Sequence, residues 1–133
     1  MYATANLHDR YKQDYVTTAS PIDLVIMLYD GCIKQMKLAK IHIEDESVRD
    51  FQVSIEKAEE IILELIRSLN MKIEMSNDLF DLYQFMVNEL VQISFSQESE
   101  RLDPIIDMMS SLRESWVEAK KSLGSNFDAE AEG

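Results

Sequence analysis

The sequence predicts an all-α protein, an antiparallel up-down-up-down four-helix bundle with a short mobile segment before it. Only 3 Gly and 2 Pro occur in 133 residues, and Leu, Met, Glu, Lys and Ala dominate over β-branched residues, which favours long helices. Apolar residues recur at spacings of three and four along four stretches, which is the period of amphipathic helices. Short polar breaks separate the stretches, so neighbouring helices are expected to run antiparallel.

The four helices are predicted over residues 21–44, 48–70, 77–96 and 104–123. Ser20 is a suitable N-cap for the first helix, because Pro21 follows at the position where a missing N–H costs nothing. Ser47 is expected to cap the second helix and Ser76 or Asn77 the third. Asp103 and Pro104 repeat the cap-then-proline pattern at the start of the fourth.

The fourth helix is expected to bury one apolar stripe and to stop at Gly124, a typical residue beyond a helix end. That stripe consists of Ile105, Met109, Leu112, Trp116, Ala119 and Leu123. Residues 125–133 have no apolar pattern and are expected to form a disordered acidic tail.

The N-terminal cap segment, residues 1–19, has an apolar pattern of its own. Leu7, Tyr11 and Tyr15 are spaced by four residues, but one short stripe is too little for a stable isolated helix. We expect this segment to dock on the bundle or to move.

Composition argues against several partners. The formal net charge is −12, which disfavours nucleic acid and anionic membrane surfaces. No apolar run is long enough to span a membrane or to form a signal peptide. The single cysteine, Cys32, fits a reducing compartment, so a cytoplasmic location is expected.

No pattern in the chain predicts an active site, a cofactor or a metal. Di-metal bundles need Glu-x-x-His pairs that point into the core. Three residues before His8 and His42, this chain has Ala5 and Ala39 in place of the required glutamates. Cys32 lies within the apolar stripe of the first helix and has no cationic neighbour, so it is predicted to be a small buried hydrophobe. We expect no enzymatic activity.

The helices carry more apolar residues than their core stripes need, which indicates grooves for partner helices. The alternative is that long bundles simply have wide apolar faces. In the first helix, Gly31 shares this second stripe and permits a close backbone approach. The second-stripe residues are Leu24, Met27, Gly31 and Leu38 in the first helix, Phe80, Val87 and Val91 in the third, and Ile106 and Val117 in the fourth.

The segment from Tyr11 to Ala39 resembles the FliS family of bacterial flagellar secretion chaperones. Its motifs VTTASP and LVIMLYDG match the family position by position, and the resemblance extends to about residue 121. It implies a chaperone that binds the disordered C-terminal segment of flagellin. From their own spacing, Tyr11 and Tyr15 are expected at the client groove, as part of a removable cover formed by the N-terminal segment. The alternative is a regulatory or structural adaptor for an anti-sigma or export-gate protein. A monomer or weak homodimer is expected.

Overall fold

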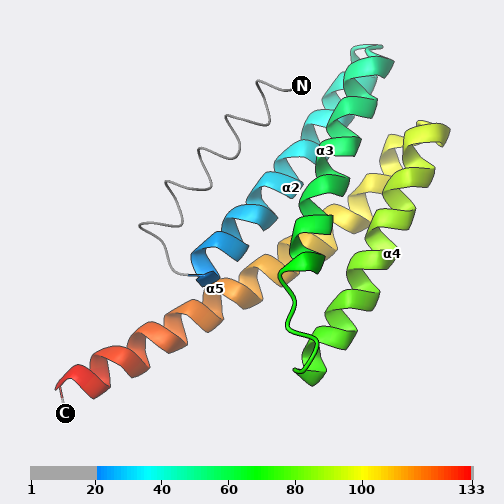
Figure 1. Cartoon of the computed structure of the whole chain (residues 1–133). Coiled ribbons are helices and arrows are strands. Elements are labelled where there is room, and N and C mark those ends of the chain that lie inside the picture. Colours follow the sequence, from blue (N-terminus) through cyan, green and yellow to red (C-terminus); the bar gives the residue numbers. More distant parts are fainter. Residues whose placement is uncertain (1–20, 133) are drawn as a thin grey trace, which may run out of the picture.

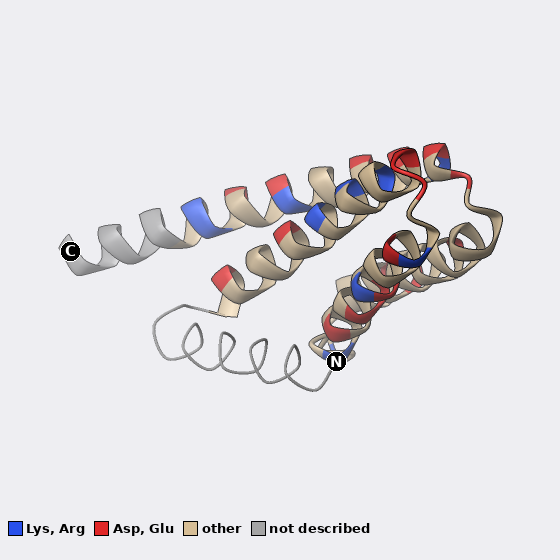
Figure 2. Ribbon diagram, turned by 90° about the horizontal axis from the view of Figure 1, so that it is seen from above, with Lys and Arg blue, Asp and Glu red and all other residues tan. Residues whose placement is uncertain are grey.

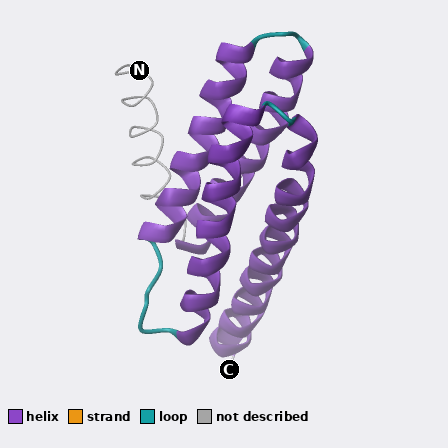
Figure 3. Cartoon of the chain, turned by 90° about the vertical axis from the view of Figure 1, so that its right-hand side faces the viewer, coloured by secondary structure: helices purple, strands orange, loops and turns teal. Residues whose placement is uncertain are grey.

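The computed structural model describes residues 21–132, with side chains as far as Leu123, and these residues fold into four helices (Figure 1). The elements are α2 (Pro21–Glu44), α3 (Val48–Arg67), α4 (Glu74–Ser96), the short 3-10 helix η1 (Ser99–Arg101) and α5 (Leu102–Glu132). Within the described residues there is no strand (Figure 3). The predicted all-α four-helix class is confirmed. The N-terminal cap segment lies outside the described residues.

Consecutive helices run in opposite directions, as an up-down-up-down bundle requires (Figure 1). α2 packs against both α3 and α5, and α3 packs against α4, whereas α4 and α5 make little contact. The helices therefore follow the order α5, α2, α3, α4. α3 thus has a neighbouring helix on each side, α2 on one and α4 on the other.

The core is a single apolar cluster to which all four helices contribute, and most of its side chains are fully buried. Burying side chains of this size stabilises the fold by about 1.5–3 kcal/mol each. Its largest fully buried members include Tyr29 and Met36 of α2, Phe51 and Ile62 of α3, Tyr83 and Leu90 of α4, and Leu102 and Ile105 of α5.

The end of α5 differs from the sequence prediction. Ala119 and Leu123 are exposed, Leu123 by 59%, because α5 runs past the beginning of α2 and leaves the bundle (Figure 1). The helix also continues through Gly124 to Glu132, whereas a stop and a disordered tail were expected. An interior glycine costs a helix only about 1 kcal/mol, and the alternating Ala and Glu residues that follow favour helix.

The turn between α2 and α3 closes α2 with a Schellman motif. The Ser47 N–H donates to the His42 carbonyl at 2.8 Å and the Glu46 N–H donates to the Ile43 carbonyl at 3.1 Å. Glu46 has φ of 61°, the left-handed conformation that this motif requires and that glycine usually supplies. The Ser47 hydroxyl donates to the Asp50 carboxylate at 2.7 Å instead of capping a backbone N–H.

The last two helices begin earlier than predicted. α4 starts at Glu74 after Ile73, so Ser76 is buried in its first turn and does not cap it. α5 starts at Leu102, directly after η1, so Asp103 and Pro104 occupy its first turn. Proline is accepted there because the N–H groups of a first turn have no intrahelical partner.

Candidate partner-binding surface

One part-buried hydrogen bond between α3 and α4 indicates the register of these two helices. Gln52 Nε2 donates to the Ser94 carbonyl at 3.3 Å. Because the helices are antiparallel, two turns further along α3 correspond to two turns back along α4. This places Glu59 opposite Val87.

Two more turns place Ile66 opposite Phe80, and all of these facing residues are half-buried. Leu63 lies one turn after Glu59, and Val91 one turn after Val87, and each is 40% exposed. We call this strip the α3–α4 seam; it consists of Glu59, Leu63, Ile66, Phe80, Val87 and Val91. It is an apolar strip with one carboxylate in it.

Glu59 is the charged member of the α3–α4 seam. Desolvation by the neighbouring side chains raises the pKa of its carboxyl group, and the nearby charges of Glu56 and Glu60 raise it further. In the described part of the chain, no cation is paired with Glu59. A cation supplied from outside would relieve both effects.

On the other side of α3, a second strip follows the contact between α2 and α3. A Cβ atom at Gly31 would lie 3.4 Å from Cδ1 of Ile61, an ordinary van der Waals contact, so Gly31 faces α3 and an alanine would also fit there. Leu24, Met27 and Leu38 share this side of α2 with Gly31 at helical spacing, and all are half-buried. We call Leu24, Met27, Gly31, Leu38 and Ile61 the α2–α3 seam.

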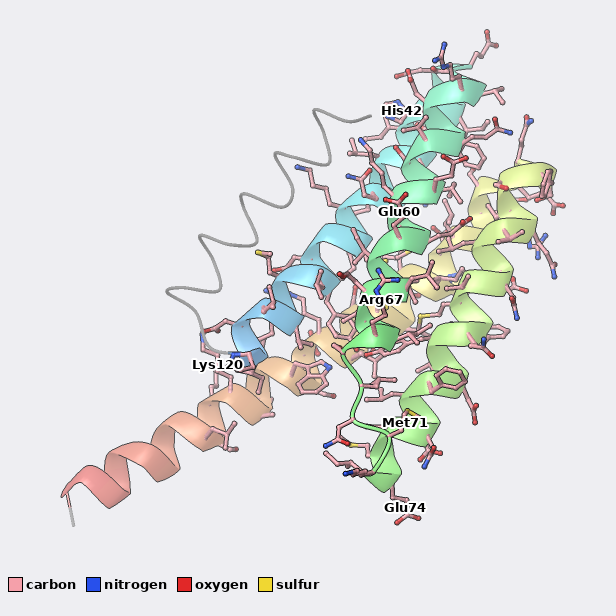
Figure 4. All side chains as sticks on the ribbon, in the orientation of Figure 1. His42, Glu60, Arg67, Met71, Glu74 and Lys120 are labelled. Carbon is pink, nitrogen blue, oxygen red and sulfur yellow. The ribbon has the colours of Figure 1, made fainter. Side chains whose placement is uncertain are left out.

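The α2–α3 seam opens into a pocket of about 300 Å³ at the beginning of α2. Leu24 and Leu28 supply its apolar wall, and the last turn of α3 supplies Glu64, Arg67 and Ser68. Arg67 pairs with Glu64 at 3.6 Å and is largely exposed. Figure 4 shows Glu60 and Arg67 on α3, which lies between the two seams. The pocket can accept one large apolar side chain.

Three ion pairs lie along the contact between α2 and α5. Asp23 pairs with Lys120, Asp30 with Arg113, and Lys40 with Asp103. Each step along α2 is matched by an equal step back along α5, so the three pairs follow one antiparallel register. Exposed pairs of this kind contribute about 0–1 kcal/mol each, but their order of charges favours this one alignment.

The same register places the two residues predicted for partner binding on the fourth helix. Ile106 and Val117 lie seven residues before and four residues after Arg113, on the side of α5 that faces α2. Both are half-buried, and Ile106 packs against the core. They therefore lie beside the α2–α5 contact, and their part in partner binding stays a prediction. Tyr11 and Tyr15 lie outside the described residues.

Several exposed apolar residues were missed by the sequence analysis. Leu63 directly follows the buried Ile62 in the sequence but lies on the outer side of α3, where it is 40% exposed. Met71, Ile73 and Met75 are 49%, 52% and 59% exposed around the turn between α3 and α4. Their clustering between two helical patterns was the signal that could have identified them.

The described residues contain no cluster of metal-ligating side chains. No three of their His, Cys, Asp and Glu residues are placed to hold a metal ion. Cys32 is fully buried, and burial raises the pKa of its thiol to about 12, so it is protonated at neutral pH, as predicted for an inert core residue. No helix in this part of the chain is long and apolar enough to cross a membrane.

Charges of both signs are spread along the helices, with acidic residues frequent near the connections (Figure 2). Glu44, Asp45 and Glu46 lie at the α2–α3 turn, and Glu98 and Glu100 lie between α4 and α5. A helical bundle with this surface and with apolar seams on both sides of one helix offers a candidate surface for binding another protein.

Comparison with known proteins identifies the family. Residues 4–123 match the sequence model of the flagellar protein FliS family. The chain belongs to that family.

The relatives include flagellar secretion chaperones from several bacteria. FliS of Bacillus subtilis strain 168 is 33% identical over 120 residues, which are 90% of each chain. FliS of Escherichia coli K12 is 30% identical over 107 residues, which cover 78% of this chain and 79% of that protein. A crystal structure of a flagellar chaperone from bacteria superposes with a TM-score of 0.74 at 24% identity, covering 90% of this chain and 98% of that one. This last likeness shows the same fold.

Proposed function

We propose that this protein is a non-enzymatic export chaperone that binds the disordered C-terminal segment of flagellin in the cytoplasm. It would prevent premature polymerisation of flagellin and deliver it to the flagellar export apparatus. The observation that supports this most directly is the pair of half-exposed apolar seams on either side of α3, in a chain of the FliS family.

The seams suit a client that is disordered when free. Such a segment loses about 2–5 kcal/mol in ordering when it binds, so it needs a long apolar surface. α3 has 20 residues and is therefore about 30 Å long, enough for several turns of a bound helix on each side. Leu24 and Met27 would hold the client along the α2–α3 seam, and Val87 and Val91 along the α3–α4 seam.

The N-terminal cap segment is proposed to shield part of this surface in the free chaperone. Its apolar face, with Tyr11 and Tyr15, needs a place to be buried, and tyrosine combines a large apolar ring with a hydroxyl that tolerates water. Bare apolar seams would promote aggregation. A weakly held segment could cover them and be displaced by the client.

The proposal is tested by mixing the purified protein with monomeric flagellin and following filament growth by light scattering. We expect a stoichiometric amount of the protein to suppress polymerisation, and flagellin lacking its C-terminal segment not to be bound. A pull-down from motile cells, read by mass spectrometry, is the companion test. Recovery of an anti-sigma or export-gate protein without flagellin would support the adaptor function instead.

A further inference from the structure

We infer that the α3–α4 seam binds a stretch of the client that is amphipathic and cationic, with a lysine or arginine placed over Glu59 and apolar residues on either side. This inference rests on the proposed function and specifies the chemistry of the segment that is bound. The occupant is a client helix with a positive charge within its apolar face.

The apolar part of the inference comes from the order of side chains along the seam. Ile66, Leu63 and Phe80 lie at one end, and Val87 and Val91 lie at the other. Glu59 lies level with Val87, with Leu63 one turn away on one side and Val91 one turn away on the other. A bound helix that follows the seam would therefore contact apolar side chains, then a carboxylate, then apolar side chains again.

The charge of the occupant follows from the surroundings of Glu59. Glu56 and Glu60 lie three residues before and one residue after it, and both charges oppose its ionisation. A carboxylate that is half-buried among apolar side chains destabilises the free protein unless it is paired. A second copy of this chain, with a net charge of −12, is a poor source of that cation.

The contact between α2 and α5, by contrast with the α3–α4 seam, has paired charges along its length. Three ion pairs lie along the α2–α5 contact, while no ion pair between α3 and α4 occurs among residues 21–123. Charges on α5 match those on α2, but the charge at the α3–α4 seam has no such match in this region. The seam is complementary to an external cation.

The test is isothermal titration calorimetry of the full-length protein with the C-terminal segment of flagellin. Glu59→Gln should weaken binding about five- to tenfold, a loss of about 1–1.4 kcal/mol, because the amide can still accept a hydrogen bond from the client cation but no longer attracts its charge. Glu56→Gln, an equal charge change at an exposed position one turn away, should alter affinity less than twofold. The melting temperature of Glu59→Gln should be equal to or higher than that of the wild type, because an unfavourable charge is removed.

A double-mutant cycle identifies the cation. Each lysine and arginine of the flagellin segment is changed to glutamine and titrated against wild type and Glu59→Gln, and one of them should show coupling of at least fivefold. If flagellin binds and no cation couples to Glu59, the inference is wrong while the proposed function stands. If wild-type protein does not bind flagellin at all, both are wrong. If Glu59→Gln changes only self-association in sedimentation, the seam is a contact between copies and the inference is also wrong.

Discussion

Tyr29 of α2 and Tyr83 of α4 meet inside the core, where their hydroxyl groups are hydrogen-bonded and their ring centroids are 6.4 Å apart. Trp116 of α5 is a further hydrogen-bond partner of the Tyr29 side chain, and its indole N–H can only donate. One polar link therefore joins three helices. It holds α2 and α4 at fixed positions on either side of α3, which sets the placement of both seams.

Tyr29→Phe should destabilise the protein more than Tyr83→Phe. Removing the Tyr29 hydroxyl leaves both Tyr83 and Trp116 without their partner, whereas removing the Tyr83 hydroxyl leaves Tyr29 still bonded to Trp116. Each unsatisfied buried polar group costs about 1–3 kcal/mol. Urea unfolding of the two variants gives the comparison, and an equal or larger loss in Tyr83→Phe would contradict the network.

Stability should fall as pH rises above about 9, in part because of Cys32. Burial raises the pKa of its thiol from 9.0 to about 12, so between these values the unfolded chain is ionised at this position and the folded chain is not. The free energy of unfolding should therefore decrease by about 1 kcal/mol per pH unit from this group, and below pH 9 its contribution should be constant. The pKa values of Tyr29 and Tyr83 are raised as well, and their contribution should be lost from about pH 10.

Cys32→Ala isolates the contribution of the thiol. Urea midpoints measured from pH 7 to 10.5 should decline less steeply in this variant than in the wild type. Parallel declines would show that the thiol does not contribute. As a control for burial, the wild-type thiol should resist maleimide labelling until urea unfolds the chain.

Leu24→Asp should impair client binding more than folding. Leu24 is half-buried at the wall of the pocket, so a carboxylate there stays in contact with water while an apolar client side chain is excluded. Ile62→Ala is the matched opposite case, because Ile62 is fully buried and its truncation should cost about 2–5 kcal/mol. Calorimetric titration and thermal melts of both variants separate the two effects; unfolding of Leu24→Asp would show that Leu24 is a core residue.

Deletion of residues 1–16 should increase self-association of the free protein. The reason is that Tyr11, Tyr15 and the surface they are proposed to cover would no longer shield one another. Client affinity should stay within about tenfold, a shift of about 1.4 kcal/mol. Analytical ultracentrifugation and titration with the flagellin segment measure the two quantities. Abolished binding would mean that the tyrosines contact the client directly.

The helical period predicted what each helix buries more reliably than what lies beside it. Cys32, Ile105 and Met109 are expected in the core and are there, because the period of 3.6 residues identifies one face of a helix. The period continues to Leu123, but burial stops earlier because α5 leaves the bundle, and the sequence of α5 alone contains no sign of that.

The candidate surface was partly predictable for the same reason. The second stripes of α2 and α4 lie on either side of α3, while Ile106 and Val117 turn toward α2. Which neighbour a stripe meets depends on the helix register, which is set by pairs such as Asp30 with Arg113 and Gln52 with Ser94. Such pairs join residues far apart in the chain. Glu59 and Leu63 become part of one surface only after α4 is placed.

Site-specific photo-crosslinking tests most directly whether the surface on both sides of α3 binds the client. A photoreactive amino acid is introduced singly at Met27 in the α2–α3 seam, at Val91 in the α3–α4 seam, and at the exposed Glu118 on α5 as a control. After irradiation with the C-terminal segment of flagellin, we predict adducts from positions 27 and 91 and none from position 118. Adducts from position 118 alone, with neither seam labelled, would contradict the proposed binding surface.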